Sequence, residues 1–169
     1  FISGEIVVFR CVVADTAWVV EQDGRIPCKA MFMRSSEANQ SSVDAAWDQI
    51  EFNELPENIG DCGDATTFQF NARRRGVYQC DLTVRPAANV SSNGLMGARF
   101  TGDGETPERG FRFVRNTNST TSANSVAVAK AVSLSDGDAV ECWSYFDFSG
   151  TATILGSNVQ TFASICEVL

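Results

Sequence analysis

The residues of this chain best suited to redox or metal chemistry are its six cysteines: Cys11, Cys28, Cys62, Cys80, Cys142 and Cys166. No two are spaced as Cys-x-x-Cys, which argues against a zinc ribbon or a thioredoxin-like motif. Cys80, Cys142 and Cys166 each fall on the apolar phase of a predicted strand, so we predict free thiols packed in the core. Cys11 and Cys28 flank a compact segment with a turn and are the predicted disulfide pair. An even count also suits a secreted disulfide framework, so the compartment stays open.

Acid–base catalysis has little support in the composition. Histidine is absent, which removes the commonest general base and every Ser-His-Asp or Cys-His arrangement. The 21 acidic residues could supply a carboxylate pair, but so many acids on an acidic surface produce accidental pairs. No nucleophile and base stand in a recognisable set, and we therefore predict a protein that is not an enzyme.

Four aspartates in predicted turns, Asp61, Asp64, Asp136 and Asp138, could offer oxygen ligands to Ca²⁺. Acids in surface loops are usually solvated, so we predict no metal site and no cofactor. The basic cluster Arg73-Arg74-Arg75 is interpreted as a solvated turn, with an anchor for an acidic neighbour as the alternative.

The charge of the chain limits its partners. A net charge of −8 and a pI near 4.5 leave no excess of Lys and Arg to neutralise phosphates, so we predict no nucleic-acid partner. No apolar run approaches the roughly 18 residues of a membrane span. The first residue is Phe1 and no secretory apolar region follows, which indicates a processed, trimmed or partial chain.

The 169 residues suffice for one well-buried domain. Residues 1–27 contain two β-branched runs around the turn Asp23-Gly24, which predicts a hairpin-like arm too small to bury a core alone. The arm either covers a sheet edge or anchors the chain to another protein, and both readings remain open. Residues 28–169 form the predicted domain.

Short strands separated by turn signals fill the domain, and no helical period extends over ten residues. This pattern predicts an all-β sandwich or barrel. The predicted strands are Lys29–Met33, Trp47–Phe52, Thr66–Phe70, Val77–Val84, Leu95–Phe100, Gly110–Val114, Val126–Leu134, Ala139–Phe146 and Gln160–Leu169. Residues 35–42 and 56–64 are predicted loops.

The central strand has two different faces. Tyr78, Cys80 and Leu82 form an apolar face that we predict lines the core. The other face consists of Gln79, Asp81 and Thr83.

Several residues at set spacings resemble a known family. The order Phe52, Asn58, Phe70, Gly76, Tyr78 is similar to the signature of the complement C1q / tumour necrosis factor-like domain. The run Leu134-Ser-Asp-Gly137-Asp138-Ala-Val140 resembles the Leu-x-x-Gly-Asp-x-Val turn of that family, and the segment around Phe162 resembles its last strand. The likeness covers about residues 28–169. From the residues alone, Gly76 should supply a backbone conformation that a Cβ would strain, and Asp136-Gly137-Asp138 a tight turn.

The resemblance implies a two-sheet antiparallel jelly-roll sandwich that assembles as a homotrimer. Residues 126–134 give an independent hint, because large residues alternate with Ala127, Ala129 and Ala131. Small apolar side chains suit the close approach of a second subunit. We therefore predict a trimer interface of the three alanines, the Gln79/Asp81/Thr83 face, and Ala163 and Ile165 of the last strand. The alternative is a sheet covered by the N-terminal arm.

The function predicted from these features is a non-enzymatic, trimeric structural or binding module on a virus particle surface. The run Trp47-x-x-Ile50-x-Phe52 resembles versions of the domain on bacteriophage and bacterial surface proteins. The most specific form is a phage capsid decoration (cement) or spike protein, with residues 1–27 binding a capsid or other particle protein. The alternative is a secreted, extracellular C1q-like recognition domain for a carbohydrate, protein or receptor ligand.

Overall fold

The computed structural model describes residues 6–13, 17–34, 39–86, 94–115, 125–147, 152–156 and 161–168. Two five-stranded antiparallel sheets contain most of these residues. The β13 sheet has the order β11 (Glu108–Arg115), β10 (Leu95–Thr101), β13 (Ala139–Asp147), β8 (Gln69–Asn71), β7 (Gly63–Asp64). The β9 sheet has the order β12 (Val126–Leu134), β9 (Gly76–Val84), β15 (Phe162–Val168), β3 (Lys29–Met33), β6 (Glu54–Ile59).

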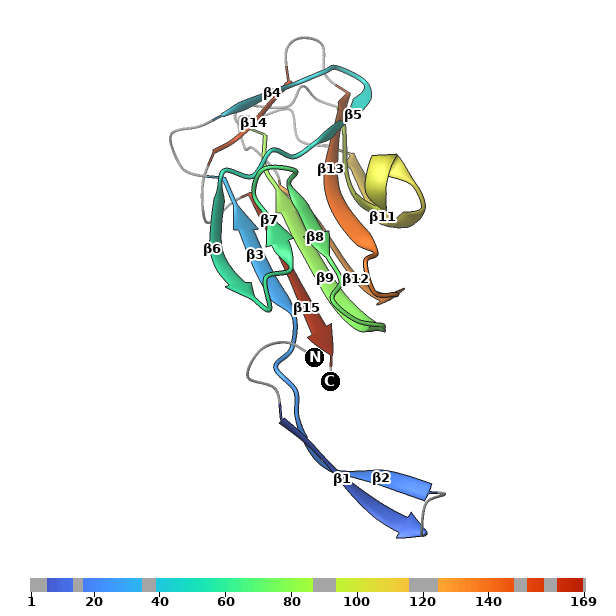
Figure 1. Ribbon diagram of the computed structural model, residues 1–169. Coiled ribbons are helices and arrows are strands. Elements are labelled where there is room, and N and C mark those ends of the chain that lie inside the picture. Colours follow the sequence, from blue (N-terminus) through green and yellow to red (C-terminus); the bar gives the residue numbers. More distant parts are fainter. Residues whose placement is uncertain are drawn as a thin grey trace.

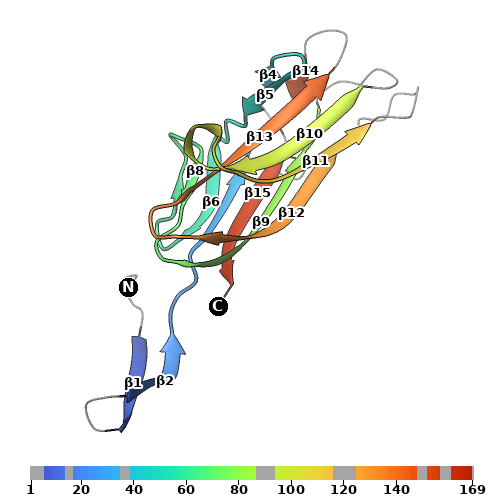
Figure 2. The same ribbon diagram turned by 90° about the vertical axis from the view of Figure 1, so that its right-hand side faces the viewer.

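The two sheets lie as separate layers of one sandwich (Figures 1 and 2). A small antiparallel pair, β4 (Gln40–Ser42) with β14 (Ala152–Ile154), lies at one end of the sandwich. Next to it β5 (Ala46–Gln49) leads into Ile50, whose N–H donates to Cys142 O at 2.9 Å. A single 3₁₀ turn, η1 (Asp103–Glu105), follows β10. In the described part of the chain no helix is long and apolar enough to cross a membrane.

Side chains from both sheets meet in one core. The largest fully buried residues include Phe32 and Tyr78 of the β9 sheet and Phe70, Phe100 and Phe146 of the β13 sheet. Each such aromatic side chain contributes on the order of 2–3 kcal/mol when it is removed from water. The predicted two-sheet, all-β antiparallel architecture is confirmed, and so is the prediction that Tyr78, Cys80 and Leu82 line the core.

Two predicted loops contain strands. Residues 56–64 were expected to be a connection, but β6 begins at Glu54 and pairs with β3. Pro56 is tolerated there because β6 is the last strand of its sheet, and an edge strand can leave one side without ladder hydrogen bonds. The polar segment 35–42 likewise ends in β4, where the Ser42 hydroxyl donates to Asp48 Oδ2 at 2.7 Å.

The last strand has the opposite phase from the one predicted. Ala163 and Ile165 are fully buried in the core, so their assignment to a trimer interface is wrong, whereas Cys166 is only half-buried on the outer face. The register explains the phase: β15 pairs Ala163 with Leu82 and Ile165 with Cys80 of β9. Residues opposite one another on neighbouring strands share a face, so the core face of β9 fixes that of β15.

The predicted disulfide between Cys11 and Cys28 is also wrong. Cys28 is a free, buried thiol directly before β3, and Cys11 belongs to β1, which lies in the arm. Cys80 and Cys142 are free and buried as predicted.

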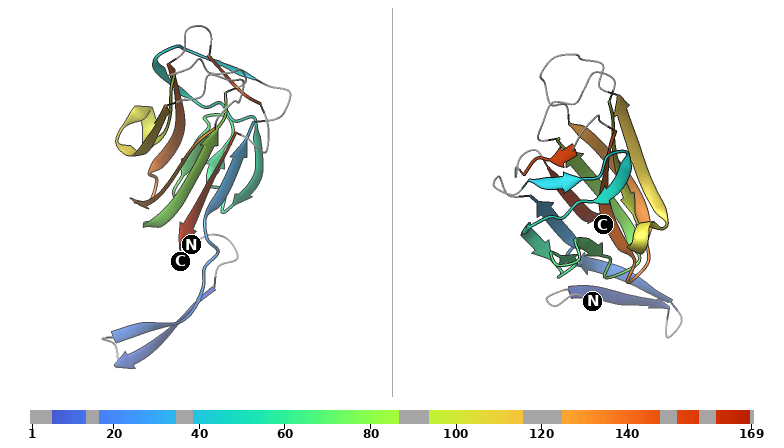
Figure 3. Two further views of the ribbon diagram at one scale, coloured as in Figure 1. Left: turned by 180° about the vertical axis from the view of Figure 1, so that it is seen from behind. Right: turned by 90° about the horizontal axis from the view of Figure 1, so that it is seen from above.

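The arm is an antiparallel pair, β1 (Ile6–Val13) with β2 (Ala17–Gly24), within the segment 1–27. Figure 1 shows this hairpin reaching away from the sandwich, and the view from behind in Figure 3 shows the same separation. The hairpin therefore covers no edge of the two large sheets. The connection from β2 to β3, residues 25–28, is called the arm root below.

Candidate functional site

The outer face of the β9 sheet is built by the residues that alternate with the core. The register places Ala127 opposite Thr83, Ala129 opposite Asp81, and Ala131 opposite Gln79. The alanines are exposed and the three β9 residues are half-buried. The structure thus brings six of the eight predicted interface residues onto one face, which we call the assembly face. Ala163 and Ile165 lie beneath it.

The assembly face continues across β15 and β3. Its further members are mostly apolar or small: Val77, Phe162, Ser164, Cys166, Val168, Met31 and Met33. Val77 and Val168 are opposite each other and 45% and 56% exposed. Asp81 lies among them and accepts a hydrogen bond from Gln79 Nε2 at 2.9 Å. At the far edge Lys29 forms an ion pair with Glu57 at 2.7 Å. A continuous face with so few charges is suited to contact with protein rather than with water.

At the β12 edge this face borders an open groove. Here β11 and β12 face each other across the sandwich, and the groove between them has a volume of about 320 Å³. Its lining residues are Glu108, Arg109, Gly110, Phe111, Val128, Ala129 and Lys130. Phe111 is 57% exposed and Val128 belongs to the core, so the groove leads from the surface to apolar side chains. Ala129 belongs to both the groove and the assembly face.

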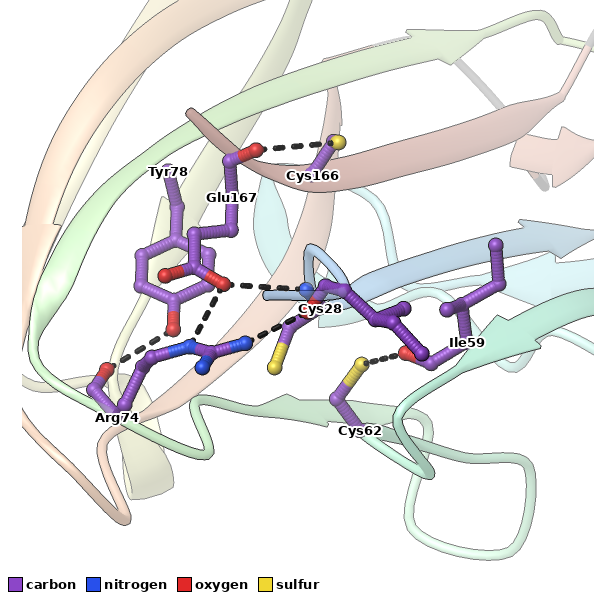
Figure 4. Close-up of polar contacts among 8 residues, drawn as sticks. Cys28, Ile59, Cys62, Arg74, Tyr78, Cys166 and Glu167 are labelled. Atoms are coloured by element: carbon purple, nitrogen blue, oxygen red, sulfur yellow. Dashed lines mark hydrogen bonds and ion pairs between the residues drawn. The ribbon is translucent and has the colours of Figure 1, made fainter. Parts of the chain in front are cut away.

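A buried ion pair lies near the start of β9, next to the arm root (Figure 4). Glu167, on the core phase of β15, accepts from Arg74 Nε at 2.9 Å and from the Cys28 N–H at 3.1 Å. Arg74 also donates to Ile26 O at 2.6 Å, and Tyr78 donates its hydroxyl proton to Arg74 O at 2.9 Å. These bonds join the arm root, the 73–75 turn and the last strand.

The interpretation of Arg73-Arg74-Arg75 as a solvated turn holds for only part of the cluster. Arg73 and Arg75 are exposed, and Arg73 pairs with the exposed Asp61 at 3.5 Å. The Arg74 side chain is 17% exposed and that of Glu167 only 3%. One signal in the sequence could have indicated that Arg74 is buried. Glu167 alternates in step with Ala163 and Ile165, so it lies on the same face of its strand, and a carboxylate buried there needs a cation.

The outer face of the β13 sheet carries an aromatic cluster that the sequence analysis missed. The rings of Trp47, Phe113 and Tyr145 lie 5.4–5.6 Å apart, centroid to centroid. The Arg99 guanidinium lies 4.3 Å from the centroid of Trp47. Gly97 makes room for this packing, because a Cβ there would lie 2.7 Å from the Phe113 ring. Aromatic and Arg side chains of this kind are typical of binding surfaces.

The acidic residues near these surfaces have structural partners. Glu141 is buried and accepts from Gln69 Nε2 at 2.6 Å and from Trp143 Nε1 at 3.2 Å. Asp64 accepts from the Thr66 N–H at 2.7 Å, and this backbone hydrogen bond is the main cause that lowers the pKa of its carboxyl group. Among the residues described, no group of three or more Cys, Asp or Glu is arranged to hold a metal ion.

The residues that carried the family resemblance have structural roles. Phe52, Phe70 and Tyr78 are fully buried, and Phe70 packs edge-on against Tyr78 at 5.5 Å. The Asn58 side chain bridges the β6–β7 turn, because it donates to Gly63 O and accepts from Gly63 N–H. Phe162 lies half-buried on the assembly face.

The glycines and aspartate of the resemblance act in two ways. Gly137, with φ +82°, forms the predicted tight turn, in which Asp138 Oδ2 accepts from the Ser135 N–H. Gly76 is not among the residues with positive φ, so the predicted backbone strain is wrong. Its benefit is space, because a Cβ would lie 3.3 Å from Glu167 Oε1.

The buried ion pair gives a stability prediction. Arg74→Ala should lower the free energy of unfolding by about 3 kcal/mol, because it leaves the Glu167 carboxylate buried without its cation. Arg73→Ala is the matched control, with an expected loss of about 0.5 kcal/mol for an exposed pair. Urea unfolding followed by tryptophan fluorescence measures both. Equal losses for the two variants would contradict the role given to Arg74.

Comparison with known proteins identifies the fold. No family model and no curated protein sequence matches the chain. Among solved structures, the Eiger TNF of S. frugiperda is 14% identical with a TM-score of 0.61, over 86% of this chain and 94% of that one. Murine APRIL is 14% identical with a TM-score of 0.61, over 85% of this chain and 100% of that one. The globular domain of zebrafish complement 1qA is 15% identical with a TM-score of 0.56, over 84% and 96%. The chain therefore has the jelly-roll fold of tumour necrosis factor and C1q domains, as the resemblance implied.

Proposed function

We propose that the chain is a non-enzymatic, homotrimeric binding module whose copies associate through the assembly face. The observation that carries this proposal is the composition of that face, where exposed Ala127, Ala129 and Ala131 adjoin the half-buried apolar residues of β15 and β3. Alanine side chains let a second backbone approach closely, and apolar area removed from water stabilises the contact by about 25 cal/mol per Å².

The groove between β11 and β12 supports the same contact. Ala129 lies at its border and Phe111 at its mouth, so a copy seated on the assembly face near β12 also covers the edge of the core. Copies related by a rotation axis use the same surfaces repeatedly, which makes a closed ring the natural product of such a contact. The jelly-roll fold and the family resemblance favour a ring of three.

The arm supports a role at the surface of a larger particle. Seven of the eight residues of β1 and four of the eight of β2 are apolar, and the hairpin lies away from the sandwich. A two-stranded hairpin alone is marginally stable in water, so an apolar one needs a partner surface. We infer that the arm binds a capsid or other particle protein, and that the whole is a phage capsid decoration or spike protein on the virion.

The thiols favour this reading over secretion. Cys28, Cys62, Cys80, Cys142 and Cys166 are all free, although oxidising compartments favour disulfides. Free thiols persist in a reducing cytosol, the compartment in which a phage protein would be made. The secreted recognition domain is accordingly the less favoured alternative.

The first test concerns assembly. The wild-type protein should be a trimer of 18.3 kDa chains by light scattering coupled to size-exclusion chromatography. Ala129→Arg should give folded monomers, because a long side chain there blocks the close approach of a second backbone that alanine allows. Ala65→Arg, the same change at an exposed turn position, should leave the trimer intact. A wild-type monomer, or an Ala129→Arg protein that stays trimeric, would refute the proposed contact.

The second test concerns the arm. Deletion of residues 1–24 keeps the arm root, so the trimer and its thermal stability should persist. Binding to purified capsids that lack the protein, measured by co-sedimentation, should fall at least 100-fold. The full-length Ala65→Arg protein, which keeps the arm, is the control and should bind the capsids as the wild type does. Undiminished co-sedimentation of the deleted form would show that the arm is not the attachment element, and the trimer measurement is independent of that result.

A further inference from the structure

Two cysteines that the sequence does not pair lie side by side beneath the arm root. Cys28 directly precedes β3, and Cys62 directly follows the turn at the end of β6. The β3–β6 register, which pairs Lys29 with Ile59, brings these chain segments together. In Figure 4 the side chains of Cys28 and Cys62 lie next to each other, and the Cys62 sulfur is directed toward Ile59 O. Burial, and in second place the charge of the neighbouring Cys28 thiol, raise the pKa of Cys62 to about 12.

The backbone on both sides holds this arrangement in place. Gly60 and Asp61 have φ values of +80° and +51°, which turns the chain back so that Cys62 Sγ donates to Ile59 O at 3.0 Å. On the other side, Cys28 N–H donates to the Glu167 carboxylate and Cys28 O accepts from Glu167 N–H at 2.8 Å. Both cysteine residues are at most 1% exposed. A disulfide forms only where the backbone holds the two Cβ atoms a short distance apart. Here hydrogen bonds and the tight turn fix the backbone on both sides.

The other described cysteines lack either a neighbouring thiol on the same side of the sheet or access from the surface. Cys166 lies on the opposite, outer face of β15, and its thiol donates to its own neighbour, Glu167 O, at 3.4 Å. Cys80 and Cys142 lie between the two sheets in the interior of the core. Cys62, by contrast, lines an open hollow of about 330 Å³. The other residues around the hollow are Asp61, Gly63, Asp64, Ala65, Asn71 and Arg73.

We propose that Cys28 and Cys62 form a reversible disulfide that fixes the arm root to the β6–β7 turn. The oxidant class is a small-molecule disulfide, which enters by the hollow next to Cys62. Because burial raises the pKa of Cys62 to about 12, its thiol must first lose its proton, which makes this step faster at high pH. The resulting thiolate attacks one sulfur of the oxidant, breaks its S–S bond and releases one small thiol. The Cys28 thiolate then attacks Cys62 Sγ, breaks the mixed disulfide and releases the second small thiol. The protein gives up two protons and two electrons, and the small disulfide takes up these protons and electrons to become two small thiols.

The position of the bond gives it a mechanical consequence. Cys28 is the last residue of the arm root, and the neighbouring Ile26 O already accepts from Arg74. Oxidation adds a covalent link from the arm root to the β6–β7 turn, whereas hydrogen bonds to Arg74 and Glu167 hold the arm root of the reduced protein. The ring of residues 28–62 also restricts the unfolded chain, which stabilises the fold. The arm is therefore held more firmly after the protein meets an oxidising environment than before.

The experiment uses the intact wild-type protein and oxidised glutathione as the oxidant. After incubation, alkylation under denaturing conditions and intact-mass measurement should show the loss of two of the six thiols. Peptide mapping without reduction should recover one cross-linked pair that contains Cys28 and Cys62. Oxidation should raise Tm by about 10 °C, and a reducing agent should reverse the rise.

Variants separate this bond from other oxidation. Cys28→Ser and Cys62→Ser should each abolish both the cross-linked peptide and the Tm shift, whereas Cys166→Ser should keep both. The peptide map of the wild-type protein keeps the test valid even where a serine variant folds poorly. Six alkylated thiols after oxidation, or a cross-link between any other pair, would overturn the proposal.

Discussion

The pairing register of β9 is the constraint on which the rest of the structure depends. β9 lies between β12 and β15, so its alternation decides which side chains of three strands enter the core. With Tyr78, Cys80 and Leu82 inward, Gln79 and Asp81 must face out. A slip by one residue would exchange the two faces and bury Asp81 without a cation, which costs several kcal/mol. The core and the assembly face are thus two consequences of a single register.

The Glu167–Arg74 pair extends this constraint to the ends of the chain. The register that buries Ile165 also buries Glu167, two residues further along β15, and a buried carboxylate must be compensated. Arg74 reaches it from the turn before β9, and its Nη2 donates to Ile26 O. One charge requirement therefore joins the last strand, the central turn and the arm root. The same requirement positions Cys28, whose N–H donates to the Glu167 carboxylate.

Much of the fold could be predicted from the sequence, because long runs such as Val126–Leu134 alternate clearly between large and small residues. The sequence does not predict which face of β15 enters the core. Every position from 163 to 166 has an apolar or small residue, so neither alternate set stands out. The register with β9, a strand about 80 residues earlier in the chain, decides which alternate residues face inward, because it pairs Ala163 with Leu82 and Ile165 with Cys80. The sequence does not predict strand β6 for a related reason. Proline is disfavoured in a strand unless that strand lies at the edge of its sheet, and the residues around Pro56 do not show where β6 lies in the sheet.

The two outer faces of the sandwich are chemically unequal, and this inequality divides their roles. The assembly face has small residues and few charges, which suits a permanent contact between identical copies. The β13 face has large rings and the cation of Arg99, which Trp47 and Trp143 contact at 4.3 and 5.4 Å from their centroids. Such rigid, amphipathic groups bind a partner at low entropic cost and are enriched among the residues that dominate binding energy. If copies of the chain associate through the first face as proposed, the second face and the arm are left for other partners.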